Sequence, residues 1–316
     1  MKIYNSIQEF DTKAKTIVTL GTFDGVHKGH ASILDKVIKS SAATGCESVV
    51  LTFFPHPRMV LQQNTDIKLL NTMNEKAYLL DKLGINNLIV HPFDRNFSRL
   101  TAEEFVKNIL VDSLNISKII IGYDHRFGRN RTATINDLIQ YGETYNFEVE
   151  QISALEVDEV SVSSTKIRNA LDDGAITKAN EFLGYNYFLS GKVVEGKKLG
   201  RTIGFPTANI AIDEDYKLIP AKGAYIVSSI INGKAVAGMM NIGSNPTVGG
   251  TAQTIEVHFL DFEGDLYGKA LKINLHERLR NETKFASVDA LKMQLEEDKS
   301  ATIHYFNTTG NEKLPL

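Results

Sequence analysis

The sequence contains one cysteine and no tryptophan among its 316 residues. The single cysteine, Cys46, excludes an intrachain disulfide framework and a zinc cluster built from paired cysteines. No apolar run reaches the ~18–20 residues that a membrane-spanning helix needs. The first residues also lack the basic-then-apolar pattern of a signal peptide. We therefore expect a cytoplasmic protein that has no contact with a membrane.

Neither sign of charge predominates in the chain. The 35 basic and 38 acidic residues give a net charge of −3, whereas binding to a nucleic-acid backbone depends on an excess of positive charge. Nucleic acid is therefore not expected as a partner. Hydrophobic residues make up 42% and charged residues 23% of the chain, as in folded globular proteins. The length corresponds to about two domains.

The first half alternates short apolar runs with segments of helical periodicity. Strands are predicted at residues 17–20, 49–54, 88–90 and 119–121, and helices around residues 33–38, 75–83 and 102–110. This alternation is typical of an α/β fold with a doubly wound parallel sheet. In such sheets a ligand binds beyond the carboxyl ends of the strands, at a topological switch point.

The pattern changes after about residue 184. Short strands are predicted at residues 193–194, 225–227, 230–231, 235–237, 255–259 and 271–273. Asn232-Gly233 is a strong hairpin signal, and the whole pattern favours a small antiparallel β-barrel. A last helix, at residues 288–297, is expected to pack Leu291 and Leu295 inward. We therefore predict two domains, residues 1–184 and residues 185–316, joined near a helix at residues 175–183.

The most informative segment is GTFDGVHKGH at residues 21–30, which follows a predicted strand and opens a predicted helix. Gly21 and Gly25 allow the backbone to approach a ligand closely, and the amides at the start of a helix favour a phosphate. His27 and His30 are three residues apart and share one helical face. There they can donate hydrogen bonds to oxygens that gain charge in a transition state. Two surface histidines are the alternative.

Two other segments follow predicted strands, where an open α/β site is built. Pro55 and Pro57 stiffen the loop around His56, although an ordinary turn explains this segment equally well. A basic cluster after the strand at residues 119–121 suits phosphate neutralisation and is otherwise a solvated loop: Arg126, Arg129 and Arg131.

A helix start is predicted at Ser164 and Thr165, which are good capping residues. Their hydroxyl groups and amides can bind a phosphate or an adenine–ribose unit. Arg168 lies one turn later and can bind a triphosphate through two hydrogen bonds. The alternative is a capped surface helix.

Taken together, these segments resemble one family. The HxGH pattern at residues 27–30 is that of nucleotidyltransferases, and the longer string resembles the prokaryotic bifunctional riboflavin kinase/FAD synthetase family. The segments at residues 54–57, 122–128 and 162–168 are similar to its FxPHP, GxDFRFG and SSTxIR motifs. The resemblance implies that ATP is bound by Gly21, Thr22, Phe23, Asp24, His27, His30, Ser164, Thr165 and Arg168. It implies that flavin is bound by Pro55, His56, Asp124 and Arg126.

Two residues depart from the family pattern in the loop that the resemblance assigns to flavin. His125 stands where the pattern usually has phenylalanine, and Thr132 stands where a glycine commonly follows the basic loop. These departures concern the detailed flavin contacts and leave the nucleotide motifs intact.

A second motif, GRTIGFPTAN, occupies residues 200–209. Thr207 and Asn209 are two apart, so on a strand their oxygens face the same way. Hydroxyl and amide oxygens suit Mg²⁺, which also keeps waters and phosphate oxygens as ligands. The glycine-rich stretch that includes Gly200 and Arg201 is suited to folding over phosphates, and a flexible polar hairpin is the alternative. The sequence has no GxxxxGK[ST], so a P-loop kinase is not supported.

A kinase that acts on a primary alcohol benefits from a group that orients the hydroxyl or accepts its proton. The candidate is Glu256, which lies between apolar neighbours in a predicted strand. An outward-facing strand glutamate without a catalytic role is the alternative, and Glu277 and Asp261 are weaker candidates. His258 shares a strand face with Glu256 and is expected to pack or form a hydrogen bond.

The second half resembles the riboflavin kinase module through residues 206–209 (PTAN), 241–247 (NIGSNPT) and the TxE-type strand at residues 254–256. The resemblance implies that MgATP is bound by Gly200, Arg201, Thr207 and Asn209, the last two at the metal. It implies that Glu256 is the catalytic base. It also implies that Arg280 and Glu282 bind flavin.

The resemblance implies a bifunctional enzyme of flavin cofactor biosynthesis. Riboflavin would be phosphorylated by ATP to FMN, and FMN would be adenylylated by a second ATP to FAD and pyrophosphate. The expected partners are these small molecules and Mg²⁺, with no obligate protein partner. The alternatives are an enzyme with one degenerate site, a non-enzymatic flavin-binding protein, and a nucleotidyltransferase for another phosphorylated alcohol.

Overall fold

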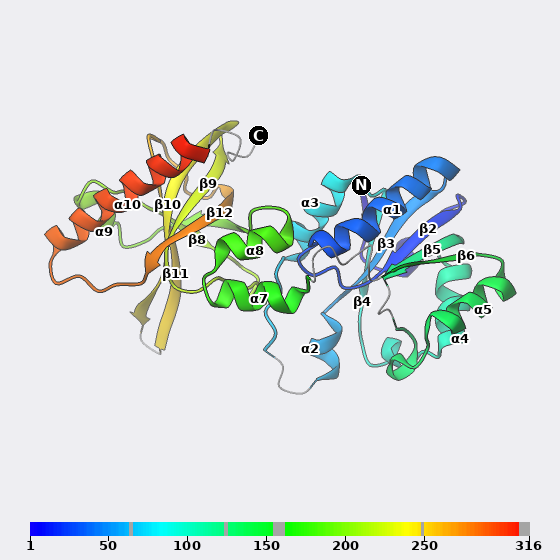
Figure 1. Cartoon of the computed structure of the whole chain (residues 1–316). Helices are drawn as coiled ribbons and strands as arrows, with labels where there is room; N and C mark the ends of the chain where they lie inside the picture. Colours follow the sequence, from blue (N-terminus) through cyan, green and yellow to red (C-terminus); the bar gives the residue numbers. More distant parts are fainter. Residues whose placement is uncertain (63–65, 123–125, 154–161, 248–249, 310–316) are drawn as a thin grey trace. The chain divides into compact units, whose positions relative to one another are not determined.

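The structure, a computed structural model, describes residues 1–62, 66–122, 126–153, 162–247 and 250–309 (Figure 1). The chain divides into two compact units, Met1–Ser164 and Thr165–Leu316. Each unit has its own sheet, a six-stranded sheet in the first and a closed barrel in the second. The prediction of an α/β domain followed by a small antiparallel barrel is therefore confirmed.

The first unit is built on a parallel sheet. Its strands are β1 (Lys2–Tyr4), β2 (Thr16–Leu20), β3 (Glu47–Phe54), β4 (Asn87–Pro92), β5 (Ile116–Gly122) and β6 (Glu148–Ile152). Their order across the sheet is β1-β4-β3-β2-β5-β6. From β2 the chain moves outward through β3 and β4, and then returns to the other side of β2 with β5 and β6. The topological switch point therefore lies between β2 and β5, where the fold predicts a ligand site.

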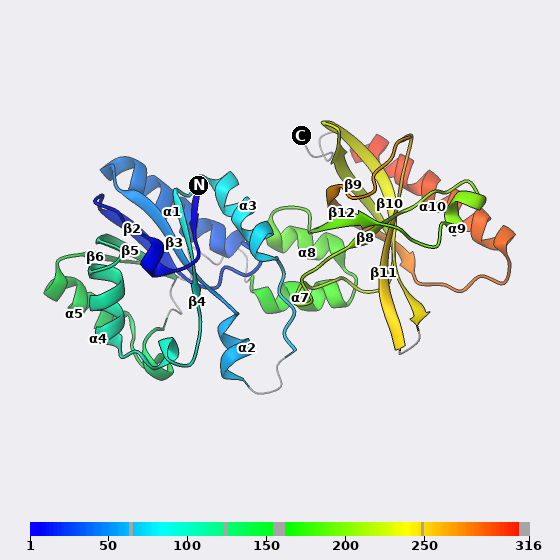
Figure 2. The same ribbon diagram turned by 180° about the vertical axis from the view of Figure 1, so that it is seen from behind.

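Helices cover both faces of this sheet (Figure 2). One face packs against α1 (Lys28–Thr44) and α3 (Met73–Leu83). The other face packs against the π-helical segment η3 (Phe105–Val111) and α5 (Ile135–Tyr145). The shorter helical segments are η1 (Ile7–Glu9), α2 (Pro57–Leu61), η2 (Phe97–Arg99), α4 (Ala102–Glu104) and η4 (Arg129–Arg131).

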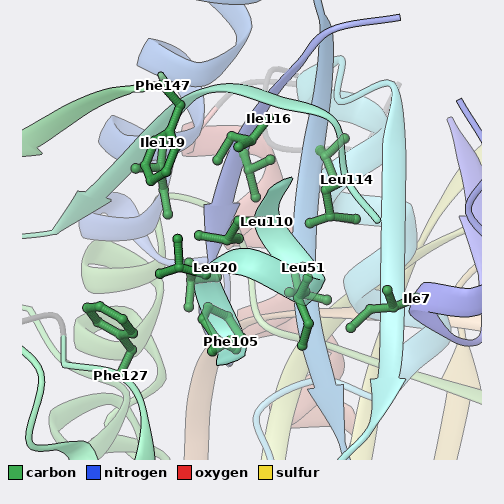
Figure 3. Close-up of a cluster of buried hydrophobic side chains, with 14 of the residues drawn as sticks. Ile7, Leu20, Leu51, Phe105, Leu110, Leu114, Ile116, Ile119, Phe127 and Phe147 are labelled. Atoms are coloured by element: carbon green, nitrogen blue, oxygen red, sulfur yellow. The ribbon is translucent and has the colours of Figure 1, made fainter. Parts of the chain in front are cut away.

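Consecutive residues of the central strands serve opposite faces of the sheet. Ile17 packs with α1 and α3, whereas Val18 packs with η3. Figure 3 shows side chains of η3, among them Phe105 and Leu110, gathered against the sheet. Because both faces are covered, the inner strands contain short apolar runs, and β2 is buried throughout. The strands β2 to β5 were therefore predicted from the sequence, whereas the partly exposed outer strands β1 and β6 were not.

The second unit is a closed barrel with the order β10-β11-β8-β7-β12-β9. Its strands are β7 (Phe188–Val194), β8 (Ala208–Ala211), β9 (Gly223–Ile231), β10 (Lys234–Thr247), β11 (Gly250–Phe259) and β12 (Ala270–Asn281). The helices that accompany them are α7 (Ser164–Asp172), α8 (Ile176–Leu183), α9 (Leu199–Thr202) and α10 (Val288–Thr309).

The hairpin predicted at Asn232-Gly233 joins β9 to β10. Both residues have positive φ angles, 52° and 77°, as a two-residue type I′ turn requires, and Ile231 pairs with Lys234 on either side. β9 is one strand where the sequence suggested two. Ser228 and Ser229 interrupt its apolar pattern, but both are buried.

Helices α7 and α8 belong to the second compact unit. The Asn180 side chain of α8 donates to Leu275 O of β12 (2.9 Å) and accepts from Tyr187 N (2.7 Å). The Ala221 amide donates to Leu171 O of α7 at 3.0 Å. The two compact units therefore meet after Ser164. The boundary between functional domains that was predicted at residue 184 stays a prediction.

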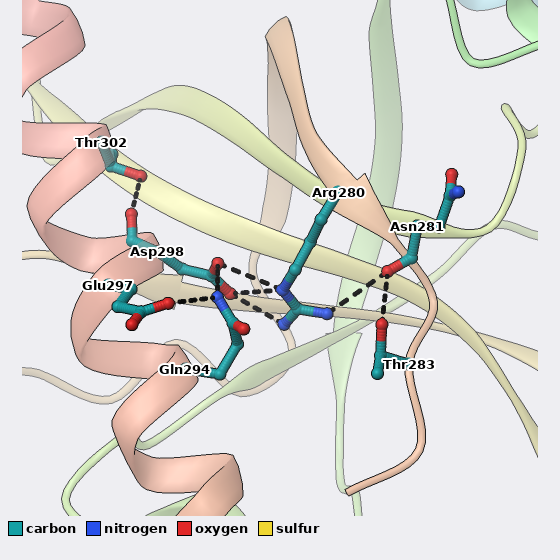
Figure 4. Close-up of polar contacts among 7 residues, drawn as sticks. All are labelled: Arg280, Asn281, Thr283, Gln294, Glu297, Asp298 and Thr302. Atoms are coloured by element: carbon teal, nitrogen blue, oxygen red, sulfur yellow. Dashed lines mark hydrogen bonds and ion pairs between the residues drawn. The ribbon is translucent and has the colours of Figure 1, made fainter.

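The last helix is longer than the sequence suggested. It reaches Thr309, and its buried residues are Asp298, Thr302 and Phe306, whereas Leu291 and Leu295 are half-buried. Asp298 forms an ion pair with Arg280 of β12 at 2.8 Å (Figure 4). A polar contact therefore anchors α10 to the barrel at the point where the predicted helix ended.

Candidate active sites

The segment after β2 forms a tight loop at the switch point of the sheet. Its first residue, Gly21, continues the ladder by donating to Leu51 O at 3.1 Å. Phe23, Gly25 and Val26 then have positive φ angles of 44°, 88° and 39°. Residues other than glycine rarely adopt this region, and left-handed residues of this kind occur in the turns that bind anions. Val26 N donates within the loop to Phe23 O at 3.2 Å, which closes the turn just before the start of α1.

Buried donors hold the carbonyl groups of this loop. Thr22 O accepts from Lys76 Nζ at 2.7 Å and from Thr52 Oγ1 at 3.2 Å. Asp24 O accepts from Ser164 Oγ at 2.9 Å. The predicted site residues Thr22, Asp24 and Ser164 are thus brought together, with Asp24 almost fully buried.

The two histidines of the HxGH pattern lie against each other at the start of α1. His27 is the N-cap residue, and its Nδ1 accepts from His30 N at 3.4 Å. Their rings stack with centroids 3.7 Å apart, and Phe23 meets His30 edge-on at 5.2 Å. Because Nδ1 of neutral His27 accepts, its proton lies on Nε2, which leaves an N–H donor for a ligand.

Both histidines are held in the neutral form. Burial lowers the pKa of His27 to about 4, and an accompanying hydrogen bond offsets this only in part. Burial also lowers the pKa of His30 well below its usual value, and electrostatic interactions with His27 and Lys76 lower it further. At neutral pH the pair therefore serves as hydrogen-bond donors without net charge.

The remaining residues predicted for this site lie on several elements. Pro55 follows β3 after a cis peptide bond, and His56 caps α2 by accepting from Arg58 N at 3.1 Å. Arg126 is exposed beyond β5. These positions surround the carboxyl ends of β3 and β5. Asp124, predicted to bind flavin, lies outside the described residues, as does His125.

Thr165 and Arg168 lie on α7, within the second compact unit. Their part in ATP binding stays a prediction.

The departure at Thr132 fits the local backbone. Thr132 has φ −80° and ψ −28°, an ordinary helical conformation, and its hydroxyl donates to Arg129 O at 3.0 Å. The glycine that this loop needs is Gly128, whose φ is 72° and whose absent side chain leaves room for the backbone of Ala102. Thr132 is therefore accommodated without strain.

Lys76 is a site residue that the sequence analysis did not identify. It lies on α3 and is only 2% exposed, whereas lysine is seldom buried without a partner. The one signal in the sequence is that Lys76 lies four residues before Leu80, on the apolar side of a predicted helix. A lysine at such a position usually extends to solvent, so the sequence did not show that Lys76 is buried.

The second site is assembled where β8 meets β11. Glu256 pairs directly with Asn209 in the antiparallel register. Thr207, just before β8, donates from Oγ1 to Glu256 Oε2 at 3.0 Å. The neighbours Ile255 and Val257 are buried in the barrel, so Glu256 is on the outer face. The structure thus brings together the predicted base and both predicted metal ligands.

The glycine-rich stretch runs closely over this face. A side chain at Gly196 would collide with the amide group of Asn209, and one at Gly200 would collide with Phe205 O. At Gly200 the obstacle is a backbone oxygen, so glycine is required there, whereas at Gly196 the Asn209 side chain would have to move. Gly200 and Arg201 lie on the short helix α9, and their part in phosphate binding stays a prediction.

The donor set at this face fits Mg²⁺. It consists of the Thr207 hydroxyl, the Asn209 amide oxygen and the Glu256 carboxylate, all hard oxygen ligands. Mg²⁺ commonly keeps waters and substrate phosphate oxygens among its ligands, so these few protein oxygens are enough to hold it.

The residues predicted to bind flavin in the second unit make contacts within the protein. Arg280 binds both carboxylate oxygens of Asp298 through Nε, at 3.1 Å each. Glu282 Oε1 accepts from Ser244 N at 3.2 Å. His258 Nδ1 lies 2.8 Å from Pro206 O, which agrees with its expected hydrogen-bonding role.

Comparison with known proteins follows the same division of the chain. The FAD synthetase family matches residues 9–166, and the riboflavin kinase family matches residues 183–306. The bifunctional riboflavin kinase/FMN adenylyltransferase of Listeria monocytogenes is 38% identical, over 93% of this chain and 94% of its own. That of Escherichia coli is 36% identical, over 93% of each chain.

The chain belongs to the bifunctional riboflavin kinase/FMN adenylyltransferase family. The resemblance inferred from the motifs is thereby confirmed. A crystal structure described as a macrolide-efflux protein from Streptococcus pneumoniae has a TM-score of 0.86 and 32% identity, and the match covers 95% of this chain and 98% of that one. No helix among the described residues is long and apolar enough to cross a membrane.

Proposed function

We propose that this member of the family catalyses both reactions that the family name describes. Residues 185–316 would phosphorylate riboflavin, and residues 1–184 would adenylylate the resulting FMN. The observation that carries the proposal is that each half has a built site. Thr207 and Asn209 lie against Glu256 on the barrel, and His27 stacks on His30 at the start of α1, directly after the loop that follows β2.

In the kinase site, the ribityl 5′-hydroxyl oxygen of riboflavin attacks the γ-phosphorus of ATP, and ADP leaves. Glu256 orients this hydroxyl and accepts its proton. The hydrogen bond from Thr207 fixes one carboxylate oxygen and leaves the other for the substrate. Thr207 and Asn209 would hold Mg²⁺, which when bound neutralises charge on the phosphate oxygens.

In the adenylyltransferase site, a phosphate oxygen of FMN attacks the α-phosphorus of a second ATP, and pyrophosphate leaves. No covalent intermediate is needed. The loop after β2 and the neutral histidines donate hydrogen bonds to oxygens that gain charge. Catalysis then depends on alignment and on charge stabilisation. Ser164, Thr165 and Arg168 are expected to bind ATP.

The test of this function is direct. Purified protein is incubated with riboflavin, ATP and Mg²⁺, and the flavins are separated by chromatography. We expect FMN to appear first and FAD to follow. FMN without FAD identifies an enzyme with one degenerate site, and neither product identifies a flavin-binding protein. Chelation of Mg²⁺ is expected to stop FMN formation.

The proposed partners are the small-molecule substrates riboflavin, FMN and ATP. A cytoplasmic location is proposed with them, because both reactions consume ATP.

A further inference from the structure

We infer that Lys76 is a positioning residue for FMN adenylylation, which holds the loop after β2 from within the protein and supplies that loop with positive charge. This inference rests on the proposed function of the first site. It concerns a residue of α3, a helix that the HxGH pattern does not include.

The position of Lys76 is fixed by its helix. Thr72 and Glu75 form a capping box at the start of α3, with hydrogen bonds of 3.0 and 3.2 Å. Leu80, one turn after Lys76, is fully buried. The ammonium group is therefore carried into the core on the apolar face of a capped helix. An apolar side chain would fill this space without the cost of burying a charge, so packing alone does not account for a lysine.

The hydrogen bond from Lys76 orients a peptide group of the loop. Lys76 Nζ donates to Thr22 O at 2.7 Å. In a trans peptide the C=O and the following N–H point in opposite directions, so the N–H of Phe23 points away from Lys76. Phe23 has a positive φ angle, and the loop that follows leads directly to His27. Lys76 thus acts on the ligand through this peptide group, without touching the ligand.

Lys76 also supplies the charge that the histidines lack. The titratable groups that interact with it are Asp24 of the loop and His30 of α1, whereas the carboxylate of the adjacent Glu75 accepts from Thr72 N in the capping box. Burial lowers the pKa of Lys76 to about 8, and Asp24 raises it in part. At pH 7 the ammonium group is therefore charged, whereas both histidines are neutral.

This charge matters most in the transition state. Negative charge spreads over the phosphate oxygens and the departing pyrophosphate as the α-phosphorus is transferred. A buried cation that is already in place stabilises such charge without reorganisation. The Asp24 side chain is itself fixed, because its Oδ1 accepts from Leu70 N, just before α3, at 2.9 Å. The loop is therefore joined to α3 by Lys76 and to the segment that precedes α3 by Leu70.

The experiment compares Lys76→Met with Lys82→Met in the full-length protein. Methionine keeps the length and apolar stem of Lys76 but removes the charge and the donor, and Lys82 is an exposed lysine of the same helix. We expect Lys76→Met to lower kcat for FAD formation from FMN by about tenfold to a hundredfold, with a smaller change in KM. Lys82→Met should form FAD at the wild-type rate. Both variants should also phosphorylate riboflavin at the wild-type rate.

A pH profile separates this role from a merely structural one. In the wild type, FAD formation should fall as pH rises through about 8, where the ammonium group loses its proton. The alkaline fall should be absent from Lys76→Met. In the same variant, the pKa of His30 measured by NMR should rise, because a nearby positive charge has been removed.

The inference is wrong if Lys76→Met keeps the wild-type kcat for FAD formation, or if its rate still falls at alkaline pH. If the variant does not fold, the pH dependence of the wild-type rate is the test. A rate of FAD formation that stays constant between pH 7 and 9.5 then contradicts the inference. Failure of the proposed function is distinguishable, because the wild type would then form no FAD at any pH.

Discussion

Thr207 and Glu256, 49 residues apart in the chain, are joined by a hydrogen bond of 3.0 Å from Thr207 Oγ1 to Glu256 Oε2. The bond links the segment before β8 to the middle of β11. One carboxylate oxygen is thereby fixed by the protein, and the hydroxyl oxygen of Thr207 remains an acceptor for a metal ion. The hydrogen bond therefore links the predicted base directly to a predicted metal ligand.

The first prediction concerns this hydrogen bond. Thr207→Val keeps the shape of the side chain but removes its hydroxyl, whereas Thr207→Ser keeps the hydroxyl. A hydrogen bond to a charged group is worth about 1.5–3 kcal/mol, so Thr207→Val should lower FMN formation at least about tenfold. Thr207→Ser should retain most of the activity. Equal rates for the two variants, measured with riboflavin and MgATP, would show that the hydroxyl has no role.

The second prediction is a dependence of stability on pH. The pKa of His27 is about 4 in the folded protein, against an ordinary value of 6.5. The unfolded chain therefore takes up a proton at a higher pH than the folded protein does. The stabilisation is complete above pH 6.5 and is lost as pH falls toward 4. The difference corresponds to about 3 kcal/mol.

Urea unfolding between pH 7 and 4.5 measures this dependence. His27→Asn does not titrate, and asparagine is a good N-cap residue, so this variant should show a shallower loss of unfolding free energy than the wild type. His304→Asn changes an exposed histidine of α10 and serves as the matched control. An identical slope for His27→Asn and the wild type would show that burial of His27 does not carry the effect.

The third prediction concerns the ion pair that anchors α10 (Figure 4). The Asp298 side chain is 5% exposed and that of Arg280 is 20% exposed. Removing one partner of a buried pair leaves an uncompensated charge, so Asp298→Ala should lower the free energy of unfolding by about 3 kcal/mol. The neighbouring Glu297→Ala, which changes an exposed carboxylate, should cost less than about 0.5 kcal/mol. Thermal unfolding of the two variants gives the comparison.

Much of the fold could be predicted because local patterns were strong. The four inner strands of the first unit contain short apolar runs, and Asn-Gly is the preferred dipeptide of the tight turn at Asn232-Gly233. The outer strands β1 and β6 carry charged residues and were not predicted. The extent of other elements was set by tertiary contacts instead. β9 continues through Ser228, whose Oγ lies 2.7 Å from His276 Nε2, on a histidine that packs against Phe306 of α10. The part of α10 after residue 297 is held to the barrel by such contacts and by the ion pair of Asp298 with Arg280.

The candidate sites show the same limit. His27 and His30 could be paired from their spacing, whereas Glu256 could be assigned as the base only through the resemblance of its strand to the kinase module. Lys76 could not be identified, because its burial depends on α3 packing beside the loop after β2. The sequence also could not show that Arg280, assigned to flavin by resemblance, binds Asp298 eighteen residues later. Long-range partners of charged residues are not encoded in local spacing.

The central claim is that one chain carries two separable active sites. It is tested most directly by mixing two variants, each of which has lost one of the two activities. Glu256→Gln should form no FMN from riboflavin but should convert supplied FMN to FAD. His30→Ala should form FMN but lower FAD formation at least about a hundredfold. With riboflavin, ATP and Mg²⁺, neither variant alone should yield appreciable FAD, and the mixture should yield FAD. Loss of both activities in either variant, or a mixture that forms no FAD, would contradict the account.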